Sequence, residues 1–253
     1  MSGEKSVDVS VVIAARNEAS NIEACMASVR WAREILVVEN DSIDDTLGIA
    51  TRAGASVFSN PFSTIGAQRN AAIDRATSDW ILVLDADERA TDALGKAVRS
   101  TIASPAHEAY RIPRRNFFLG REIRHGGWER DRPVRLFRRS LRYDASRVHE
   151  RVETLGAPGV LSEPLLHYTY TSLDQYFEKF DRYSKWWAAD RFARGRRAGP
   201  VDVFFRPRLR FFSMYVLRGG WMDGAAGAVL ASLASASVLA KYARLWALSR
   251  KDE

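Results

Sequence analysis

An uninterrupted apolar run that ends in clustered carboxylates is the feature that most constrains this chain of 253 residues. Residues 80–84 read Trp-Ile-Leu-Val-Leu, and Asp85, Asp87 and Glu88 follow almost directly. A short run of β-branched and large aliphatic residues without alternation predicts a strand that is buried on both faces, as in an open parallel sheet. Such sheets bind ligands beyond the carboxyl ends of their strands. We therefore expect these carboxylates at a binding edge.

Two interpretations of the carboxylate group remain open. Like charges held close together are unfavourable unless a cation neutralises them, which favours a divalent metal carrying a phosphorylated substrate. Alternatively, the residues form a solvated loop after a core strand, in which Asp87 or Glu88 caps the next helix.

The first hundred residues alternate between strand-like and helix-like patterns. Strands are predicted at residues 9–13, 34–38, 55–59 and 80–84, and helices at residues 22–29, 45–53 and 65–76. This alternation implies βαβ units, a parallel sheet and right-handed crossovers. After residue 103, short β-like pieces at 109–112, 116–119 and 134–137 indicate an irregular, partly antiparallel second half, and residues 173–192 predict a helix.

The net charge of +7 is unevenly placed. Residues 111–151 hold 13 arginines and no lysine against five acidic residues, and residues 191–218 hold eight arginines interleaved with aromatic residues. Arginine suits bidentate phosphate contacts and aromatic stacking. A nucleoside diphosphate, a nucleic acid or an anionic membrane surface would each fit, and a solvated basic surface is the alternative for most of these arginines.

Compartment and membrane signals are sparse. The single cysteine, Cys25, excludes an internal disulfide framework and a Cys-rich zinc site, and no apolar segment near the N-terminus predicts a secretory signal. A cytosolic protein is expected. Residues 224–240 are free of charge but mostly Ala, Ser and Gly, which favours a helix packed on small residues or lying at a membrane interface over a membrane span.

Four polar motifs follow or flank the predicted strands and should converge at one sheet edge. They are Ala14-Ala15-Arg16-Asn17-Glu18, Glu39-Asn40-Asp41-Ser42-Ile43-Asp44-Asp45-Thr46, Gln68-Arg69-Asn70 and Asp85-Ala86-Asp87-Glu88. This ordered set resembles the family 2 glycosyltransferases of GT-A type. Four later motifs are similar to the bacterial subgroup that includes lipopolysaccharide-core β-glucosyltransferases: Gly126-Gly127-Trp128, Arg135-Leu136-Phe137-Arg138-Arg139, Val148-His149-Glu150 and Leu166-His167-Tyr168.

The resemblance implies a fold and a domain plan. The expected fold is α/β: a GT-A, Rossmann-like nucleotide-sugar-binding fold with a mainly parallel central sheet, followed by a helical C-terminal extension. Residues 1–170 would form the glycosyltransferase domain, with a nucleotide-binding half at 1–103 and an acceptor or catalytic half at 104–170. Residues 171–253 would form the extension, at or near a membrane surface.

The resemblance also implies roles for individual residues. For the nucleotide of the donor, Ala15 and Glu18 would lie near the base and ribose, and Glu39 at the nucleoside. Arg69 would approach the base or the phosphates, and Asp85 the ribose or the outer metal shell. Gly126, Gly127 and Trp128 would lie beside the donor sugar. Asp87 and His167 would bind Mg²⁺ or Mn²⁺. Glu150 is the candidate catalytic base, and Glu129 and Asp131 are its rivals.

Several of these positions have a second interpretation. His149 and Glu150 can form a local ion pair, His167 can be a core histidine, and Trp128 can pin its loop instead of stacking on a sugar. The chain also departs from the family pattern, with Glu39 for the usual Asp, Asp41 for Gly and Ile43 for Thr. A further departure is His149-Glu150 in place of the commoner Glu-Asp pair.

The expected reaction is metal-dependent, inverting transfer of a sugar from a nucleoside-diphosphate sugar, with UDP as the nucleotide. A divalent cation would offset charge on the leaving diphosphate, and a carboxylate would deprotonate the acceptor hydroxyl. The expected acceptor is a saccharide or lipid-linked glycan of the cell envelope, met at the inner face of the cytoplasmic membrane. No nucleic-acid partner is expected.

Two other classes of protein remain as alternatives. One is a nucleotidyltransferase of related fold, and the other is a non-catalytic basic module that binds membranes or nucleic acid. The chain has no Gly-rich P-loop and no G-x-G-x-x-G after its first strand, which argues against a P-loop kinase and a dinucleotide-dependent oxidoreductase.

Overall fold

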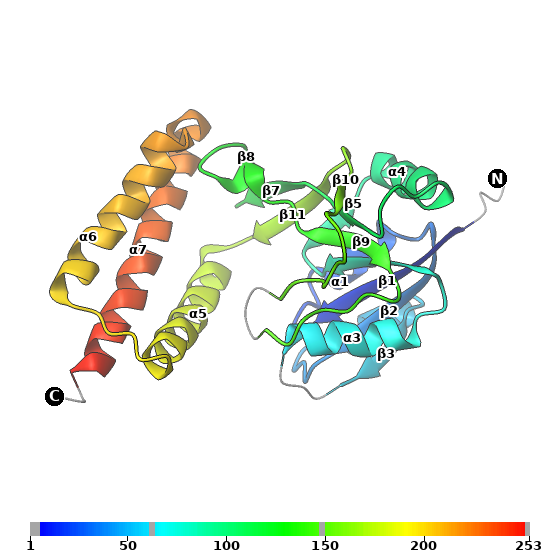
Figure 1. Ribbon diagram of the computed structural model, residues 1–253, viewed down its shortest axis with the longest axis horizontal. Coiled ribbons are helices and arrows are strands. Elements are labelled where there is room, and N and C mark those ends of the chain that lie inside the picture. Colours follow the sequence, from blue (N-terminus) through cyan, green and yellow to red (C-terminus); the bar gives the residue numbers. More distant parts are fainter. Residues whose placement is uncertain (1–5, 61–63, 147–149, 251–253) are drawn as a thin grey trace. The chain divides into compact units, whose positions relative to one another are not determined.

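The computed structural model describes residues 6–60, 64–146 and 150–250, which form two compact units (Figure 1). The first unit contains the described residues up to Arg114 together with Arg132–His167. The second contains Arg115–Asp131 and the described residues from Tyr168 onward. The domain boundary expected at residue 170 stays a prediction, and the second unit takes in a segment that this boundary would assign to the first domain.

A seven-stranded sheet forms the centre of the first unit, in the order β10-β6-β9-β4-β1-β2-β3. Its strands are β1 (Val7–Ala15), β2 (Ala32–Glu39), β3 (Ser56–Ser59), β4 (Trp80–Asp85), β6 (Ala109–Arg111), β9 (Val134–Arg138) and β10 (Gly159–Val160). β3, β2, β1 and β4 run parallel, whereas β9 is antiparallel to both β4 and β6. The predicted strands and the mainly parallel sheet with an antiparallel second half are confirmed.

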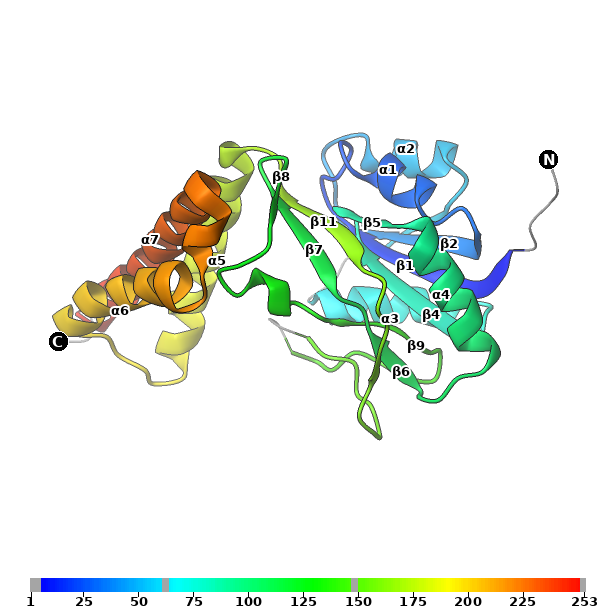
Figure 2. The ribbon, with the colours of Figure 1, turned by 90° about the horizontal axis from the view of Figure 1, so that it is seen from above.

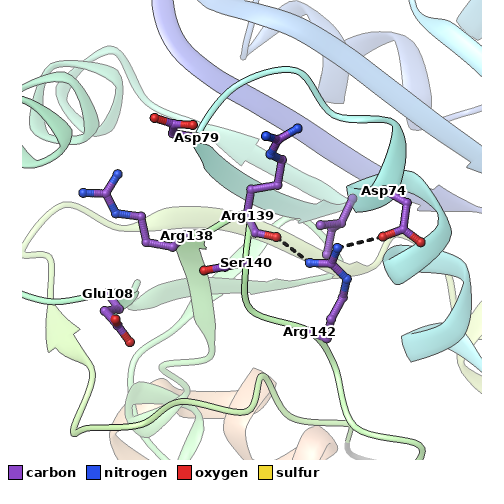
Figure 3. A pocket seen from close by; sticks show the side chains of 8 residues that line it. Asp74, Asp79, Glu108, Arg138, Arg139, Ser140 and Arg142 are labelled. Carbon is purple, nitrogen blue, oxygen red and sulfur yellow. Dashed lines mark hydrogen bonds and ion pairs between the residues drawn. The ribbon is translucent and has the colours of Figure 1, made fainter.

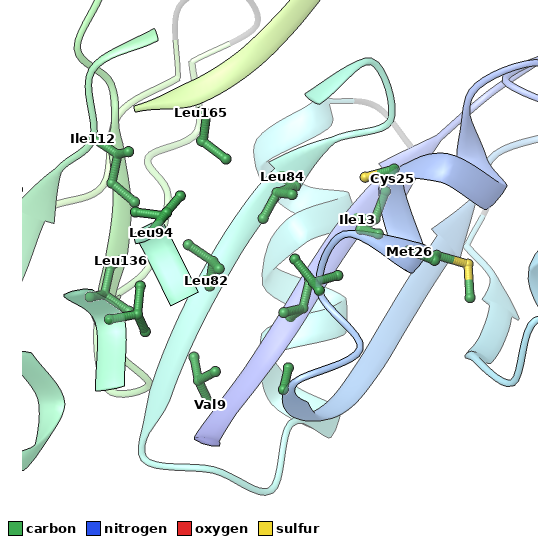
Figure 4. Packing of buried hydrophobic residues seen from close by; sticks show 14 of the residues in the cluster. Val9, Ile13, Cys25, Met26, Leu82, Leu84, Leu94, Ile112, Leu136 and Leu165 are labelled. Carbon is green, nitrogen blue, oxygen red and sulfur yellow. The ribbon is translucent and has the colours of Figure 1, made fainter. Parts of the chain in front are cut away.

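Both faces of this sheet are covered by helices (Figure 2). One face carries α1 (Ile22–Ala27), α2 (Thr46–Arg52) and α4 (Asp92–Ala103), and the other carries α3 (Ile65–Arg75). Leu82 and Leu84 pack with Cys25 and Leu94 on the first face (Figure 4), whereas Ile81 packs on the α3 face. Because neighbouring strand residues point to opposite faces, burial of both faces explains the apolar run without alternation.

The chain between β4 and α4 corrects one of the sequence-based alternatives. Thr91 caps α4, since its side-chain oxygen accepts a hydrogen bond from the Leu94 backbone N–H at 3.1 Å. Capping by Asp87 or Glu88 is therefore wrong. Glu88 instead begins β5 (Glu88–Ala90), which pairs antiparallel with β11 (Leu165–Tyr170) and sets Glu88 opposite His167.

The second unit combines a β-hairpin with a group of helices. β7 (Arg114–Phe118) pairs with β8 (Arg121–Ile123), and the helices are α5 (Leu173–Ala193), α6 (Pro200–Phe212) and α7 (Gly224–Ser249). A π-helix (Ser213–Leu217) and a 3₁₀ helix (Gly220–Asp223) join α6 to α7. The predicted helix at 173–192 and the helical C-terminal region are confirmed.

α7 contacts both α5 and α6, and small residues allow one of its close contacts. A Cβ at Gly227 would lie 1.9 Å from the carbonyl oxygen of Gly220, so no larger residue fits there. The segment Gly220–Ser249 is long and apolar enough to cross a membrane by length and composition alone, with a mean hydropathy of 1.4 in its most apolar window. Only 17% of that window is buried, so much of the helix surface remains open.

Candidate active site

The loops that follow β1 and β2 are joined by hydrogen bonds. The backbone N–H of Asn17 donates to the Ser42 hydroxyl at 3.0 Å, and the Ile43 N–H donates back to the Asn17 side-chain oxygen at 2.9 Å. The Glu18 N–H donates to the Thr46 hydroxyl at 2.8 Å. The first two motifs therefore converge at the carboxyl edge of the sheet, as the parallel arrangement predicts.

The departures in the second motif have structural consequences. Asp41 adopts a left-handed backbone with φ of 49°, which explains why glycine is the usual residue there. Aspartate tolerates this conformation better than most residues with a side chain. Glu39, at the end of β2, is buried beside Ala15 and its longer side chain turns back to accept a hydrogen bond from the Ser42 N–H.

Asp85, at the end of β4, is held by three arginines from three elements. Arg69 comes from α3, Arg114 from the start of β7 and Arg135 from β9, and the Arg114–Asp85 distance is 2.9 Å. Burial disfavours the charged carboxylate, but the three guanidinium groups outweigh it and hold the pKa of Asp85 well below its usual range. Asp85 is thus an ionised carboxylate whose position is fixed by protein cations.

Glu88 is fully buried and shares two of these arginines. One carboxylate oxygen lies 2.5 Å from Arg114 and 3.1 Å from Arg135, and the other accepts the Asp85 backbone N–H at 2.8 Å. A buried carboxylate is tolerated only with such charge pairing and hydrogen bonding. Arginines therefore offset the charge of Asp85 and Glu88, a source of positive charge that the interpretation of the sequence did not include.

Asp87 faces a different partner. Its Oδ1 lies 3.5 Å from Nε2 of His167, and both side chains are largely buried. The β5–β11 pairing brings them together across 80 positions of sequence. His167 therefore lies beside a carboxylate in a largely buried position, which fits both a metal ligand and a core histidine whose ring is satisfied by Asp87. Within residues 6–60, 64–146 and 150–250, no group of three or more His, Cys, Asp or Glu side chains could hold a metal by itself.

The candidate base Glu150 is tied to the same cluster. Arg69 donates to Oε1 of Glu150 at 2.6 Å and also to Asp85, so one guanidinium bridges the two carboxylates. His149, the neighbour with which Glu150 can form an ion pair, lies outside the described residues.

Asn70, in the third motif, holds the chain around Tyr143 against α3, shortly before Glu150. The side chain of Asn70 donates to the Tyr143 carbonyl at 3.0 Å and accepts from the Tyr143 N–H at 2.9 Å. One turn earlier, a Cβ at Gly66 would lie 2.9 Å from the Asp144 carbonyl oxygen, so glycine permits the close approach. Positioning of this segment is a role of Asn70 that the sequence did not predict.

Comparison with known proteins assigns the family. The sequence profile described as Glycosyl transferase family 2 matches residues 10–153, more than half of the chain. The chain belongs to glycosyltransferase family 2. The enzyme is therefore a glycosyltransferase, which decides against the nucleotidyltransferase and the non-catalytic binding module.

Similar glycosyltransferases align with this family 2 enzyme over most of its length. The lipopolysaccharide core biosynthesis glycosyltransferase LpsC of Rhizobium meliloti (strain 1021) is 28% identical over 251 residues, 93% of each chain. An uncharacterized glycosyltransferase of Rickettsia felis is 26% identical over 239 residues, 87% of this chain and 83% of the relative.

Solved structures that resemble the chain have lower sequence identity than these relatives. Glucosyl-3-phosphoglycerate synthase from Mycobacterium tuberculosis, crystallised with Mn²⁺, UDP and glucosyl-3-phosphoglycerate, is 22% identical with a TM-score of 0.38 over 45% of each chain. TarS of S. aureus is 15% identical with a TM-score of 0.47, over 70% of this chain and 39% of that one.

The glycine loop of the family 2 enzyme lies in the second unit. Gly126 and Gly127 have φ angles of 74° and 95°, which favour glycine. The Gly126 N–H donates to the Arg218 carbonyl at 2.9 Å, and a Cβ at Gly127 would lie 2.6 Å from the Arg218 side chain. Trp128 packs on the cluster around Phe118, which supports its role in pinning the loop.

The rival bases flank this loop. Glu129 accepts the Gly127 N–H at 2.9 Å and pairs with Arg130 at 3.2 Å, so its carboxylate already stabilises the loop. Asp131 follows the 3₁₀ helix Trp128–Arg130, and its N–H donates to the Trp128 carbonyl. Glu150 shares the guanidinium of Arg69 with Asp85, whereas Glu129 pairs with Arg130.

The sequence signal missed two of the residues that build this site. Arg114 and Arg135 received no role, although both lie in the arginine-rich stretch at 111–151 and Arg135 begins one of the motifs that carry the family resemblance. Composition marked that stretch as basic, but it could not separate these buried arginines from exposed ones such as Arg130.

A cavity of 590 Å³ lies elsewhere on the first unit (Figure 3). Its lining consists of Ile73, Asp74, Asp79, Glu108, Arg138, Arg139, Ser140 and Arg142. Asp79 precedes β4, so this cavity lies at the amino end of that strand, whereas Asp85 lies at its carboxyl end. Arg142 pairs with Asp74 at 2.7 Å, and no residue of the predicted site lines the cavity.

Proposed function

We propose that this family 2 glycosyltransferase transfers a sugar, with inversion, from a UDP-sugar to a saccharide or lipid-linked glycan of the cell envelope, and that a divalent metal is required. The observation that carries the proposal is the carboxylate and arginine cluster at the end of β4. There Arg69 bridges Asp85 and Glu150, and Asp87, in the turn between β4 and β5, faces His167 of β11.

The donor set fits a metal that is completed by its substrate. Asp87 and His167 would hold Mg²⁺ or Mn²⁺, because a carboxylate and an imidazole nitrogen within 3.5 Å of each other can approach one cation. Two protein ligands leave coordination positions for diphosphate oxygens. When bound, the ion would stabilise negative charge on the leaving nucleoside diphosphate.

The remaining residues would bind the nucleotide and move the proton. Asp85 is 32% exposed and ionised, so it can accept a hydrogen bond from a ribose hydroxyl while the arginines fix its position. Ala15, Glu18 and Glu39 lie in or beside the joined loops and would surround the base and ribose. Glu150 would take the proton of the acceptor hydroxyl, and a single displacement with one base inverts the anomeric centre.

The acceptor class is supported by a relative and by the second unit. The relative LpsC is described as a lipopolysaccharide core biosynthesis glycosyltransferase. Core saccharides are built on lipid, so the enzyme would work in the cytoplasm at the inner face of the membrane. The arginine-rich, partly exposed apolar helices of the second unit agree with that location.

The decisive experiment measures release of nucleoside diphosphate from a panel of nucleotide sugars with Mn²⁺, Mg²⁺ or EDTA. We expect one UDP-sugar to be turned over only with metal, and Asp87→Ala to lose at least about 99% of the rate because a metal ligand is removed. Asp74→Ala, which removes an exposed carboxylate from α3, is the matched control and should keep the wild-type rate.

Two results would contradict the proposal. Turnover that is equal with Mn²⁺ and with EDTA would remove the metal from the mechanism. Preference for a nucleotide other than UDP would leave the reaction class intact and change only the donor.

A further inference from the structure

Helix α6 has two unlike sides. Pro207 is buried and Phe211 is half-buried on the side that packs toward α7, and α6 and α7 lie side by side within the second unit (Figure 1). Five exposed apolar residues, here called the α6 outer face, lie on the side turned away from α7, with Phe204 at the margin next to Phe211: Val201, Phe204, Phe205, Leu209 and Phe212. Their spacing of three, four and seven or eight positions places them along one side of the helix.

The α6 outer face is unusually open for side chains of this size. Its members expose between 50% and 68% of their surface. Single exposed apolar residues are ordinary, but a continuous apolar stripe on a helix marks a surface that contacts a partner. The turn after α6 continues this character, since Leu217, Trp221 and Met222 are also more than half exposed.

The charge around the α6 outer face identifies the kind of partner. Residues 191–218 contain eight arginines, one carboxylate and no lysine, which gives this segment a net charge of +7. The one carboxylate, Asp202, is already paired with Arg206 at 2.6 Å. Arg208 lies within the apolar stripe, with its guanidinium 3.7 Å from the centre of the Phe204 ring. Apolar and cationic groups thus share one side of the helix.

Other partners fit this combination less well. A symmetric contact between two copies of α6 would bring like charges together. A nucleic acid would meet the arginines but leave aliphatic side chains such as Val201 and Leu209 without an apolar counterpart, because such interfaces are polar. An anionic bilayer supplies both, since acyl chains accept the apolar side chains and phosphates pair with arginine.

We propose that the α6 outer face docks on an anionic lipid bilayer, with α6 lying in the plane of the membrane as an interfacial helix. This inference builds on the proposed lipid-linked acceptor, and it names the surface through which the enzyme would reach it. The binding is reversible and electrostatically assisted, so high salt weakens it.

The test uses one environment-sensitive probe on the full-length chain. Cys25 is fully buried, and burial raises the pKa of its thiol, so it does not compete for a thiol-reactive dye. Leu209→Cys then introduces the single accessible thiol. Leu155→Cys, at a 93% exposed position of the first unit, is the matched control.

With vesicles of phosphatidylcholine and phosphatidylglycerol, we expect the dye at residue 209 to brighten severalfold and shift to the blue. Vesicles of phosphatidylcholine alone should give a much smaller change, and the dye at residue 155 should not respond to either. No response at residue 209 would overturn the proposal. A response that depends only on protein concentration would also overturn it, because it indicates contact with a second copy of the chain. A response only to single-stranded DNA would overturn it as well.

A second variant measures the contribution of the apolar side chains. The triple variant Phe205→Ser, Leu209→Ser and Phe212→Ser should lower the vesicle partition coefficient at least about tenfold, because three partly inserted apolar groups are lost. Its thermal midpoint and UDP release should match the wild type, because all three residues are exposed. Unchanged partition would overturn the proposal. Vesicle binding needs no sugar nucleotide, so it is read separately from the proposed reaction.

Discussion

Arginine plays opposite parts in the two units. In the first unit, Arg69, Arg114 and Arg135 are largely buried and paired with Asp85, Glu88 or Glu150. In the second unit, arginines such as Arg208 are exposed and lie beside aromatic rings. The first group fixes the geometry of a carboxylate cluster, and the second forms part of a surface. Burial and partner, and not residue type, decide what an arginine does here.

The largest expected effect comes from a buried arginine. Arg135→Ala should lower the free energy of unfolding by about 3–5 kcal/mol, because it leaves the buried Glu88 carboxylate with less compensation. The side chain of Arg135 is 4% exposed, whereas Arg208 is an exposed residue of α6. Arg208→Ala is the control and should change the value by less than about 1 kcal/mol. Urea denaturation measures the free energy of unfolding of both variants. Equal losses would contradict the distinction between buried and exposed arginines.

Replacing Glu150 tests whether the catalytic base comes from the first unit. Glu150→Gln should slow sugar transfer by about 10²–10⁴-fold, because the amide cannot take the acceptor proton. The free energy of unfolding should change less than in Arg135→Ala, since Arg69 keeps Asp85 as a partner. Steady-state rates of UDP release with acceptor give the comparison.

The rival bases of the second unit serve as matched variants. Glu129→Gln and Asp131→Asn should each retain most of the transfer rate, and Glu129→Gln should mainly loosen the glycine loop. A loss confined to either rival variant would move the catalytic base to the second unit.

A smaller effect is expected from an ion pair of the second unit. Hydrogen bonds from Arg115, followed by the nearby Arg124, lower the pKa of Glu122 to about 2 from 4.5. Because the pKa of Glu122 is lower in the folded than in the unfolded protein, its carboxylate stabilises the fold at pH values above the unfolded pKa of about 4.5. This stabilisation is lost as pH falls from about 4.5 to about 2. Glu122→Gln should cost about 1 kcal/mol at pH 7. Urea denaturation at several pH values should show this difference disappearing by pH of about 2, and a constant difference would contradict the assignment.

The smallest effect belongs to an exposed helix pair. Arg194 lies 3.1 Å from Asp190 one turn earlier, and both side chains are more than half exposed. Arg194→Ala should cost no more than about 0.5 kcal/mol in unfolding free energy. A loss above about 1 kcal/mol would show that exposed arginines of this unit stabilise the fold after all.

Elements with strong local periodicity were predictable. β1, β2, β4, α3 and α5 follow their predicted ranges closely, because their apolar spacing reports which faces are buried. For α4, a helix after Glu88 was part of one interpretation, but its range and its cap Thr91 were not predicted although Leu94 and Val98 show helical spacing. α6 lies in the predicted helical extension, but its bounds were not predicted because arginines, aromatics and Pro207 interrupt any simple pattern. β5 is a short strand that exists through pairing with β11, which has β7 as its other neighbour.

The predicted site was recovered unevenly for a similar reason. Placement of Asp85 and Asp87 at a sheet edge followed from the buried run before them. The approach of His167 to Asp87 was expected only through resemblance to the family, and it depends on the register of β11 with β5. The role of Asn70 in holding Tyr143 had no local signal at all.

The sequence by itself determined the parallel sheet, the order of the motifs along its edge and the family. Those follow from periodicity and from residue identity at fixed spacing, which are local properties of the chain. Only the tertiary structure decided which charges meet. The arginines that hold Asp85 are 16, 29 and 50 positions away along the chain. They converge because the fold brings α3, Arg114 and β9 to the carboxyl end of β4, and ion pairing at such separations depends on that arrangement.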